Sequence, residues 1–201
     1  MPPLLASSYA AMVSTGKLID PGIAARVFVS PRKRAQTTYG LLFGFDVSHS
    51  QVVAEKVTVT EETADWNYGD YEGLLTSEIQ DYRRAKGLDS DCDWDIWRDG
   101  CEGEESVQEV TNRLDHLITK INDIHRSCIM HGEAPADVVL LAHGHILRTF
   151  VKRWLRIPMA DQFSIMMPSG AIGILSYDDH MINKPALLVG LAPQSEKGIA
   201  N

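Results

Sequence analysis

Apolar runs and amphipathic segments alternate along the chain, and this pattern predicts an α/β fold. Ala25 to Val29 form a short run rich in β-branched residues, and Val138 to Ala142 are apolar at every position. The second run predicts a strand covered on both faces of a mostly parallel sheet. Near the C-terminus, AIGILSY and PALLVGLA flank the polar stretch DDHMINK, which predicts two further strands joined by a turn.

The clearest helical segment runs from Val107 to Ile124, where apolar residues recur every three or four positions. Ser106, followed three residues later by Glu109, fits a capping box at its start. A second helix is expected after the apolar run that ends at Ala142, because apolar residues have helical spacing there until Pro158. This order of strand, turn and helix is typical of an α/β sheet.

The strand ending at Val29 is also followed by a predicted helix, since Ser30 is a good cap and Pro31 suits the first helical position. Another helix is expected from Leu4 to Gly16. Residues 60–105 have few periodic apolar positions, which predicts a long excursion over one face of the sheet, where binding loops tend to lie. With no repeat or linker in the sequence, residues 1–201 are expected to form a single domain.

The composition is that of a globular protein, with 44% hydrophobic and 23% charged residues in 201 positions. The net charge of −8 argues against nucleic acid or an anionic membrane as the main partner. Three cysteines without a C-x-x-C pair favour a reducing cytosol over a disulfide framework or a zinc site. No apolar run reaches the roughly 18 residues that span a bilayer, and no basic flank marks a signal peptide, so a cytoplasmic protein is expected.

A basic cluster, Arg32, Lys33 and Arg34, lies between the first predicted strand and its helix. The free N–H groups at a helix N-terminus favour anions, and arginine adds planar donors that suit phosphate. The cluster therefore indicates a phosphate site in an otherwise acidic chain. The alternative is a solvated basic turn with no ligand.

His143, Gly144 and His145 directly follow the apolar strand. Crevices at the carboxyl ends of strands are where α/β sheets place their binding sites, so this position favours a functional histidine. A metal-dependent hydrolase that uses both histidines is the rival hypothesis. It requires further ligands at neighbouring strand ends, and the sequence identifies none, so no metal is expected.

The segment from Asp65 to Gly73 is dense in carboxylates, aromatic rings and glycine. A carboxyl group shielded by aromatic rings can serve as a general acid, although a capped acidic turn explains the same pattern. Trp94, Trp97 and Arg98 can form a wall for a polyol or phosphate. Packing is the alternative role for these three residues.

The sequences SPRKRA, DWNYGDYEG, WRDGCEGEES and LAHGHILR occur in this order, and together they resemble the histidine phosphatase superfamily of phosphoglycerate-mutase-like enzymes. YGDYEG and IWRDGCE resemble most closely the sedoheptulose-1,7-bisphosphatase branch, whose enzymes act in pentose phosphate metabolism. The resemblance covers roughly residues 10–192. It implies a three-layer α/β/α sandwich with a mostly parallel central sheet and a phosphatase that acts on small sugar phosphates without a cofactor.

In this superfamily, a histidine of an N-terminal Arg-His-Gly motif attacks the phosphate and becomes phosphohistidine. Arginines and histidines hold the phosphate oxygens, and a carboxylic acid protonates the leaving alkoxide. The resemblance assigns the phosphate clamp to Arg34 and the second pocket histidine to His143. It assigns the acid, usually a glutamate, to Asp65.

The resemblance also assigns a substrate contact to Tyr68, and a more distant phosphate contact to Arg84 with its neighbours Arg83 and Lys86. The chain departs from the family pattern because it contains no Arg-His-Gly triplet. We therefore expect an N-terminally shortened domain that lacks the first strand, exposes strand edges and is prone to self-association as a homo-oligomer. We expect it to hydrolyse sugar bisphosphates slowly or not at all. The alternative function is an inactive phosphatase fold that binds phosphorylated metabolites or a protein partner.

Overall fold

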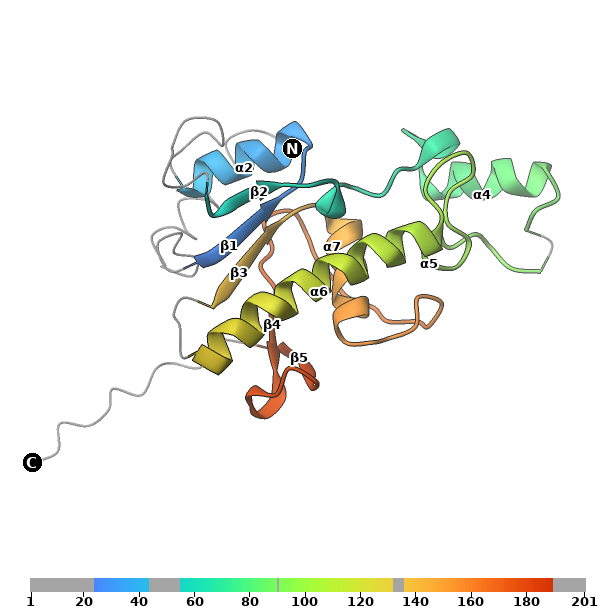
Figure 1. The fold of residues 1–201 in the computed structure, drawn as a ribbon. Helices are drawn as coiled ribbons and strands as arrows, with labels where there is room; N and C mark the ends of the chain where they lie inside the picture. Colours follow the sequence, from blue (N-terminus) through green and yellow to red (C-terminus); the bar gives the residue numbers. More distant parts are fainter. Residues whose placement is uncertain (1–23, 44–54, 90, 132–135, 190–201) are drawn as a thin grey trace, which may run out of the picture.

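A three-stranded parallel sheet forms the centre of the described structure (Figure 1). The computed structural model describes residues 24–43, 55–89, 91–131 and 136–189. The sheet has the order β2-β1-β3, and a separate antiparallel pair is formed by β4 and β5. The strands are β1 (Ala24–Val29), β2 (Val57–Val59), β3 (Asp137–Leu141), β4 (Ile174–Tyr177) and β5 (Pro185–Leu188).

Helices α2 (Lys33–Phe43) on one face and α6 (Val107–His131) and α7 (Gly144–Trp154) on the other pack against this sheet. The other α-helices are α4 (Thr76–Ala85) and α5 (Ile96–Asp99). Short 3-10 turns are η1 (Glu61–Thr63), η2 (Gly69–Tyr71) and η3 (Asp178–His180). The predicted helix from Leu4 to Gly16 lies outside the described residues.

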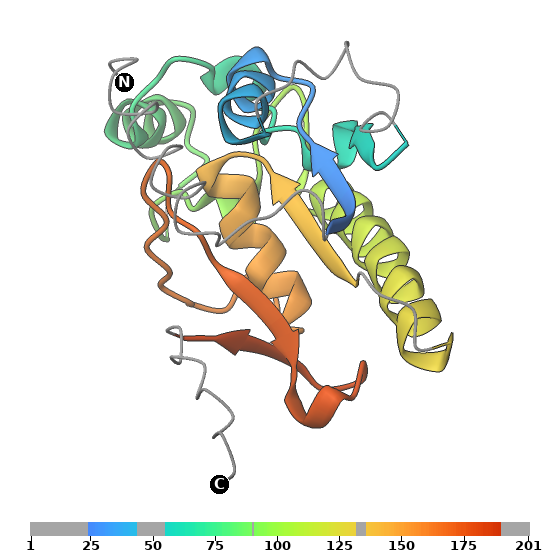
Figure 2. The same cartoon turned by 90° about the vertical axis from the view of Figure 1, so that its left-hand side faces the viewer.

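The alternation of side chains along β1 separates two hydrophobic clusters. Val27 and Val29 pack with Tyr39 of α2 on one face, whereas Phe28 packs with residues of α6 and α7 on the other. Successive strand residues point to opposite faces, so one strand contributes to both clusters. Figure 2 shows β4 and β5 beside α7, on the side of the sheet remote from α2. The three-layer α/β/α architecture predicted from the sequence is therefore present.

The long amphipathic helix is confirmed as α6. Its buried residues, Val110, Leu114, Leu117 and Ile121, follow the predicted spacing and face the larger cluster. The predicted capping box is also present, since the Ser106 main-chain N–H donates to Glu109 Oε2 at 2.8 Å and the Glu109 N–H donates to Ser106 Oγ at 3.2 Å. The pattern of the sequence thus fixes the start and the buried face of this helix.

Two predicted details of the strand–helix units are wrong. The helix expected to begin at Pro31 begins at Lys33, because the Ser30 N–H still continues the ladder by donating to Leu141 O at 2.9 Å. The strand expected to be covered on both faces is half-buried over residues 138–141. Within the described residues β3 pairs with β1 alone, and an edge strand is less covered than a central one.

The excursion over residues 60–105 contains a helix that the apolar pattern did not predict. Helix α4 buries Ile79 and Arg83, and the Arg83 guanidinium pairs with Asp89 at 2.9 Å and donates to the Tyr71 hydroxyl at 3.0 Å. Arg83 can be buried because Asp89 and Tyr71 pair with its guanidinium. An arginine on the buried face interrupts the apolar spacing by which a helix is recognised in the sequence. No helix within the described ranges is both long enough and apolar enough to cross a membrane.

Replacement of a buried leucine tests how much α6 contributes to the core. Leu117 is 0% exposed, so Leu117→Ala should lower the free energy of unfolding by about 2–5 kcal/mol. Ile129 on the same helix is 56% exposed, so Ile129→Ala should change it by about 0.5 kcal/mol or less. Urea unfolding followed by circular dichroism measures both. Equal losses in the two variants would contradict the described burial of α6.

Candidate active site

The candidate site forms where the carboxyl ends of β1 and β3 lie next to each other. Their parallel register pairs Val29 with Leu141, so the residues that follow each strand emerge at the same edge of the sheet. Arg34, in the first turn of α2, and His143, at the start of α7, are thereby brought together. The Arg34 Nε–H donates to His143 Nδ1 at 2.7 Å, although 109 positions separate the two residues.

Both ring nitrogens of His143 have a partner. Nδ1 accepts the hydrogen bond from Arg34, and Nε2 lies 2.7 Å from Ser30 Oγ. Arginine only donates, so Nδ1 carries no proton and the neutral ring has its proton on Nε2. The Nε2–H therefore donates to the Ser30 hydroxyl oxygen. Ser30, predicted as a helix cap, instead fixes the orientation of the histidine, and its position directly after a strand is the signal for this role.

Asp65 completes the arrangement predicted for the phosphate site. Its carboxylate forms an ion pair with Arg34 Nη2, and its Oδ2 lies 3.7 Å from His143 Nδ1. The other carboxylate oxygen accepts the Trp66 main-chain N–H at 3.1 Å. The Arg34 side chain remains 68% exposed, so its guanidinium is open to a dissolved anion. The three residues predicted as clamp, pocket histidine and acid thus meet at one point.

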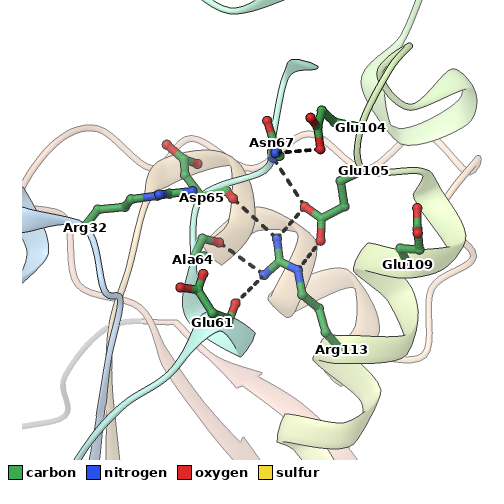
Figure 3. A pocket seen from close by; sticks show the side chains of 9 residues that line it. All are labelled: Arg32, Glu61, Ala64, Asp65, Asn67, Glu104, Glu105, Glu109 and Arg113. Atoms are coloured by element: carbon green, nitrogen blue, oxygen red, sulfur yellow. Dashed lines mark hydrogen bonds and ion pairs between the residues drawn. The ribbon is translucent and has the colours of Figure 1, made fainter.

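Burial and neighbouring charges both act on His143. Burial lowers the pKa of the imidazole, the Asp65 carboxylate opposes this shift, and the guanidinium groups of Arg34 and Arg32 reinforce it. The lowered pKa favours the neutral imidazole at neutral pH. Arg32 and Lys33 are both exposed, and Arg32 reaches the rim of a hollow beside Asp65 (Figure 3).

Tyr68 and His145 form a second pair close to this site. The Tyr68 hydroxyl lies 2.6 Å from His145 Nδ1, within hydrogen-bonding distance, and the imidazole packs edge-on against Trp97. The Trp97 Nε1–H donates to Thr149 Oγ1 at 3.0 Å, which fixes the indole. Burial lowers the pKa of His145 and raises the pKa of Tyr68, so both are neutral at physiological pH.

The two histidines of the H-x-H sequence thus have different partners. In the part of the chain that the structure describes, no group of three or more His, Cys, Asp or Glu side chains is arranged to hold a metal ion. In the sequence analysis, His145 is named only as a candidate metal ligand. The structure instead pairs it with the Tyr68 hydroxyl and packs it against the Trp97 ring.

The basic residues of α4 have partners outside the Arg34 site. Arg83 is buried against Asp89, and Arg84 forms ion pairs with Asp81 at 2.9 Å and Asp93 at 2.8 Å. Figure 1 shows α4 at the end of the molecule away from β1 and α2. The structure therefore does not join Arg84 to the three residues of the candidate site, and its predicted contact with a distal phosphate stays a prediction.

The remaining residues of this segment are mainly structural. Lys86 forms an ion pair with Glu102 at 3.3 Å. Trp94 is buried and donates its Nε1–H to Gly100 O at 2.8 Å, and Arg98 pairs with Asp99 at 2.7 Å. The packing alternative thus holds for Trp94, and Trp97 also packs against the larger hydrophobic cluster.

The structure is thus an α/β/α protein in which an arginine, a histidine and a carboxylate meet at the carboxyl ends of parallel strands. The family model of the histidine phosphatase superfamily (branch 1) matches residues 2–185. The chain therefore belongs to the histidine phosphatase superfamily. The two curated relatives that match it are phosphatases, which are phosphoric monoester hydrolases.

Two curated relatives show the same membership. Sedoheptulose 1,7-bisphosphatase of Saccharomyces cerevisiae is 34% identical over 203 residues, which cover 85% of this chain and 74% of the relative. An acid phosphatase of Mycobacterium tuberculosis is 32% identical over 162 residues, which cover 81% of this chain and 66% of that protein.

Solved structures show a related fold. A protein from Mycobacterium tuberculosis superposes with a TM-score of 0.63 at 28% identity, over 92% of this chain and 78% of that one. A putative α-ribazole-5′-phosphate phosphatase from Escherichia coli has a TM-score of 0.61 at 17% identity, over 92% and 79% of the two chains. The second likeness bears on the fold alone.

Titration of His143 tests the electrostatics of the site. Asp65→Asn should lower the pKa of His143 further, because the carboxylate that favours the imidazolium is removed. Arg34→Met should raise the pKa, because a neighbouring positive charge is lost. NMR of the imidazole signals measures both shifts, with Arg126→Met as a control at an exposed pair on α6. Shifts in the same direction for both variants would contradict the described arrangement.

Proposed function

We propose that this protein hydrolyses phosphate monoesters of small sugars and that sedoheptulose 1,7-bisphosphate is its substrate. The observation that carries this proposal is the meeting of Arg34, His143 and Asp65 at the carboxyl ends of β1 and β3. The identity of 34% to a sedoheptulose 1,7-bisphosphatase supports the choice of substrate. The reducing compartment favoured by the three cysteines supports a cytoplasmic location.

The three residues supply complementary chemistry to a phosphate ester. The Arg34 guanidinium clamps phosphate oxygens and stabilises the negative charge that develops on them. His143 is the second polar group of the pocket, held in place by Arg34 at Nδ1 and by Ser30 at Nε2. Asp65, in the form that carries a proton, gives this proton to the leaving alkoxide and is left as the carboxylate; the alkoxide is a poor leaving group without it. Tyr68, held by His145, borders the space in which the sugar lies.

The phosphohistidine scheme of the family requires a nucleophilic histidine. None of the seven histidines in the sequence stands in an Arg-His-Gly triplet, so residues 1–201 supply the clamp and the acid of this scheme but not its nucleophile. We therefore expect the 201-residue chain by itself to bind phosphate and to release it from esters slowly or not at all.

A catalytically inactive fold that binds phosphorylated metabolites or a protein partner is the second candidate. Phosphate binding requires Arg34 and His143 but has no use for an acid. The presence of Asp65 within ion-pairing reach of Arg34 therefore favours the phosphatase. The side chains of this scheme need no metal or organic cofactor.

Phosphate release from sedoheptulose 1,7-bisphosphate tests the proposal. The protein isolated from the cells that make it is compared with the 201-residue chain, after intact-mass analysis has established both N-termini. We expect turnover by the isolated protein through an acid-labile phosphohistidine. Arg34→Met and His143→Ala in that protein should lower kcat/KM by about 10²–10³-fold, since each removes one polar group of the phosphate pocket.

Arg126→Met is the matched control, because Arg126 is an exposed arginine of α6 that pairs only with Asp123 among the described salt bridges. Phosphate binding without turnover by the isolated protein would instead support the binding function. Loss of turnover in the control would show that the assay reports general damage to the fold.

A further inference from the structure

A second arginine, Arg113, lies beside Asp65, the proposed acid of the candidate site. Arg113, on α6, points its guanidinium into the hollow that Asp65 also borders, and Figure 3 shows it surrounded by main-chain and carboxylate oxygens. Its side chain is 15% exposed. A buried guanidinium requires acceptors for its five N–H groups, so the identity of these acceptors indicates what the residue does.

Arg113 binds the main chain that leads into Asp65. Its Nη1 donates to Glu62 O at 2.9 Å and to Ala64 O at 3.1 Å, and its Nη2 lies 3.5 Å from Asp65 O. These carbonyls belong to η1 and to the two residues that follow it. The arginine thus ties the short segment from η1 to Asp65 to helix α6.

The partner of Arg113 holds the chain on the other side of Asp65. Both carboxylate oxygens of Glu105 bind the guanidinium, with Oε2 at 2.8 Å from Nη2. The same Oε2 accepts the Asn67 main-chain N–H at 3.3 Å, and Glu105 O accepts the Trp66 Nε1–H at 3.0 Å. The ion pair therefore fixes the main chain before and after the acid.

We propose that Arg113 and Glu105 are positioning residues that hold the main chain of Asp65 at the distance from which its carboxyl group reaches the leaving oxygen. This inference rests on the proposed function. An acid acts only within hydrogen-bonding reach of the atom that it protonates. Aspartate is one methylene shorter than the glutamate usual in the family, so its reach depends closely on where the main chain lies.

Lys120 provides a matched control on the same helix. Its ammonium group binds both carboxylate oxygens of Glu62, at 3.1 and 2.9 Å, and so ties α6 to the same turn of the chain. It contacts a side chain, however, and not the main chain that carries Asp65. A general effect of losing a cation from α6 should appear in Lys120→Met, whereas an effect on the acid should not.

The first test needs no turnover, because the Asp65 carboxylate acts on the pKa of His143. In Arg113→Met the carboxylate should move away, and the pKa of His143 in the 201-residue chain should fall towards its value in Asp65→Asn. Lys120→Met should leave it unchanged. NMR titration of His143 measures all three. A wild-type pKa of His143 in folded Arg113→Met would overturn the inference.

The milder variants Arg113→Lys and Glu105→Gln serve where the methionine variant does not fold. Lysine keeps the charge but loses the planar fork that spans several carbonyls, so its effect should lie between wild type and Arg113→Met. A pKa of His143 that is unchanged in both folded mild variants would overturn the inference just as plainly.

The second test uses the leaving group, in the active protein isolated from cells. A sugar phosphate releases an alkoxide that needs the acid, whereas p-nitrophenyl phosphate releases a stabilised phenolate that does not. Arg113→Met should therefore slow the sugar phosphate about 10–100-fold more than p-nitrophenyl phosphate. Equal losses on both substrates would overturn the positioning role. Absence of turnover in the wild type would overturn the proposed function instead, while the His143 titration still decides the inference.

Discussion

The parallel pairing of β1 with β3 is the contact on which the candidate site depends. Its register places Val29 opposite Leu141, and the Ser30 N–H extends the ladder to Leu141 O. A slip of one residue would shift Arg34 by about 3.3 Å relative to His143 and would turn the side chains of β1 to the opposite faces. The hydrophobic clusters on the two faces of the sheet prevent this slip, because Phe28 and Val29 fit different neighbours. Packing of the core therefore sets the geometry of the polar site.

Asp65, the proposed acid, lies in a part of the chain outside the strands of the sheet. Asp65 follows η1 and precedes η2, in a segment whose main-chain groups bind side chains as well as one another. Helix α6 holds this segment. Its capping box at Ser106 and Glu109 fixes the start of the helix, and Arg113, one turn after Glu109, binds the main chain of the segment. The site thus combines a rigid edge of the sheet with a loop held by one long helix.

The sequence predicts most of the regular elements and three residues of the site, for different reasons. Strands β1, β3, β4 and β5 and helices α6 and α7 follow from apolar patterns, which core packing imposes directly on the sequence. Arg34, His143 and Asp65 follow from motifs of the superfamily. The helix α4 was missed because Arg83 occupies its buried face. The partners of Arg113 leave no local pattern at all, since main-chain carbonyls distant in sequence accept its hydrogen bonds.

Under the proposed function, Asp65 and a phosphate group would compete for the Arg34 guanidinium. Arg34 gives one N–H to His143 Nδ1 and binds Asp65 through Nη2, so an incoming phosphate meets a donor that the acid already uses. The charge of a phosphate dianion exceeds that of one carboxylate, and arginine binds it in a bidentate manner, so under the proposed function the phosphate would displace the side chain of Asp65. The displaced carboxyl group must then stay within reach of the leaving oxygen. Because the Arg113–Glu105 pair binds the main chain and leaves the Asp65 side chain free, it permits this displacement without loss of the acid from the site.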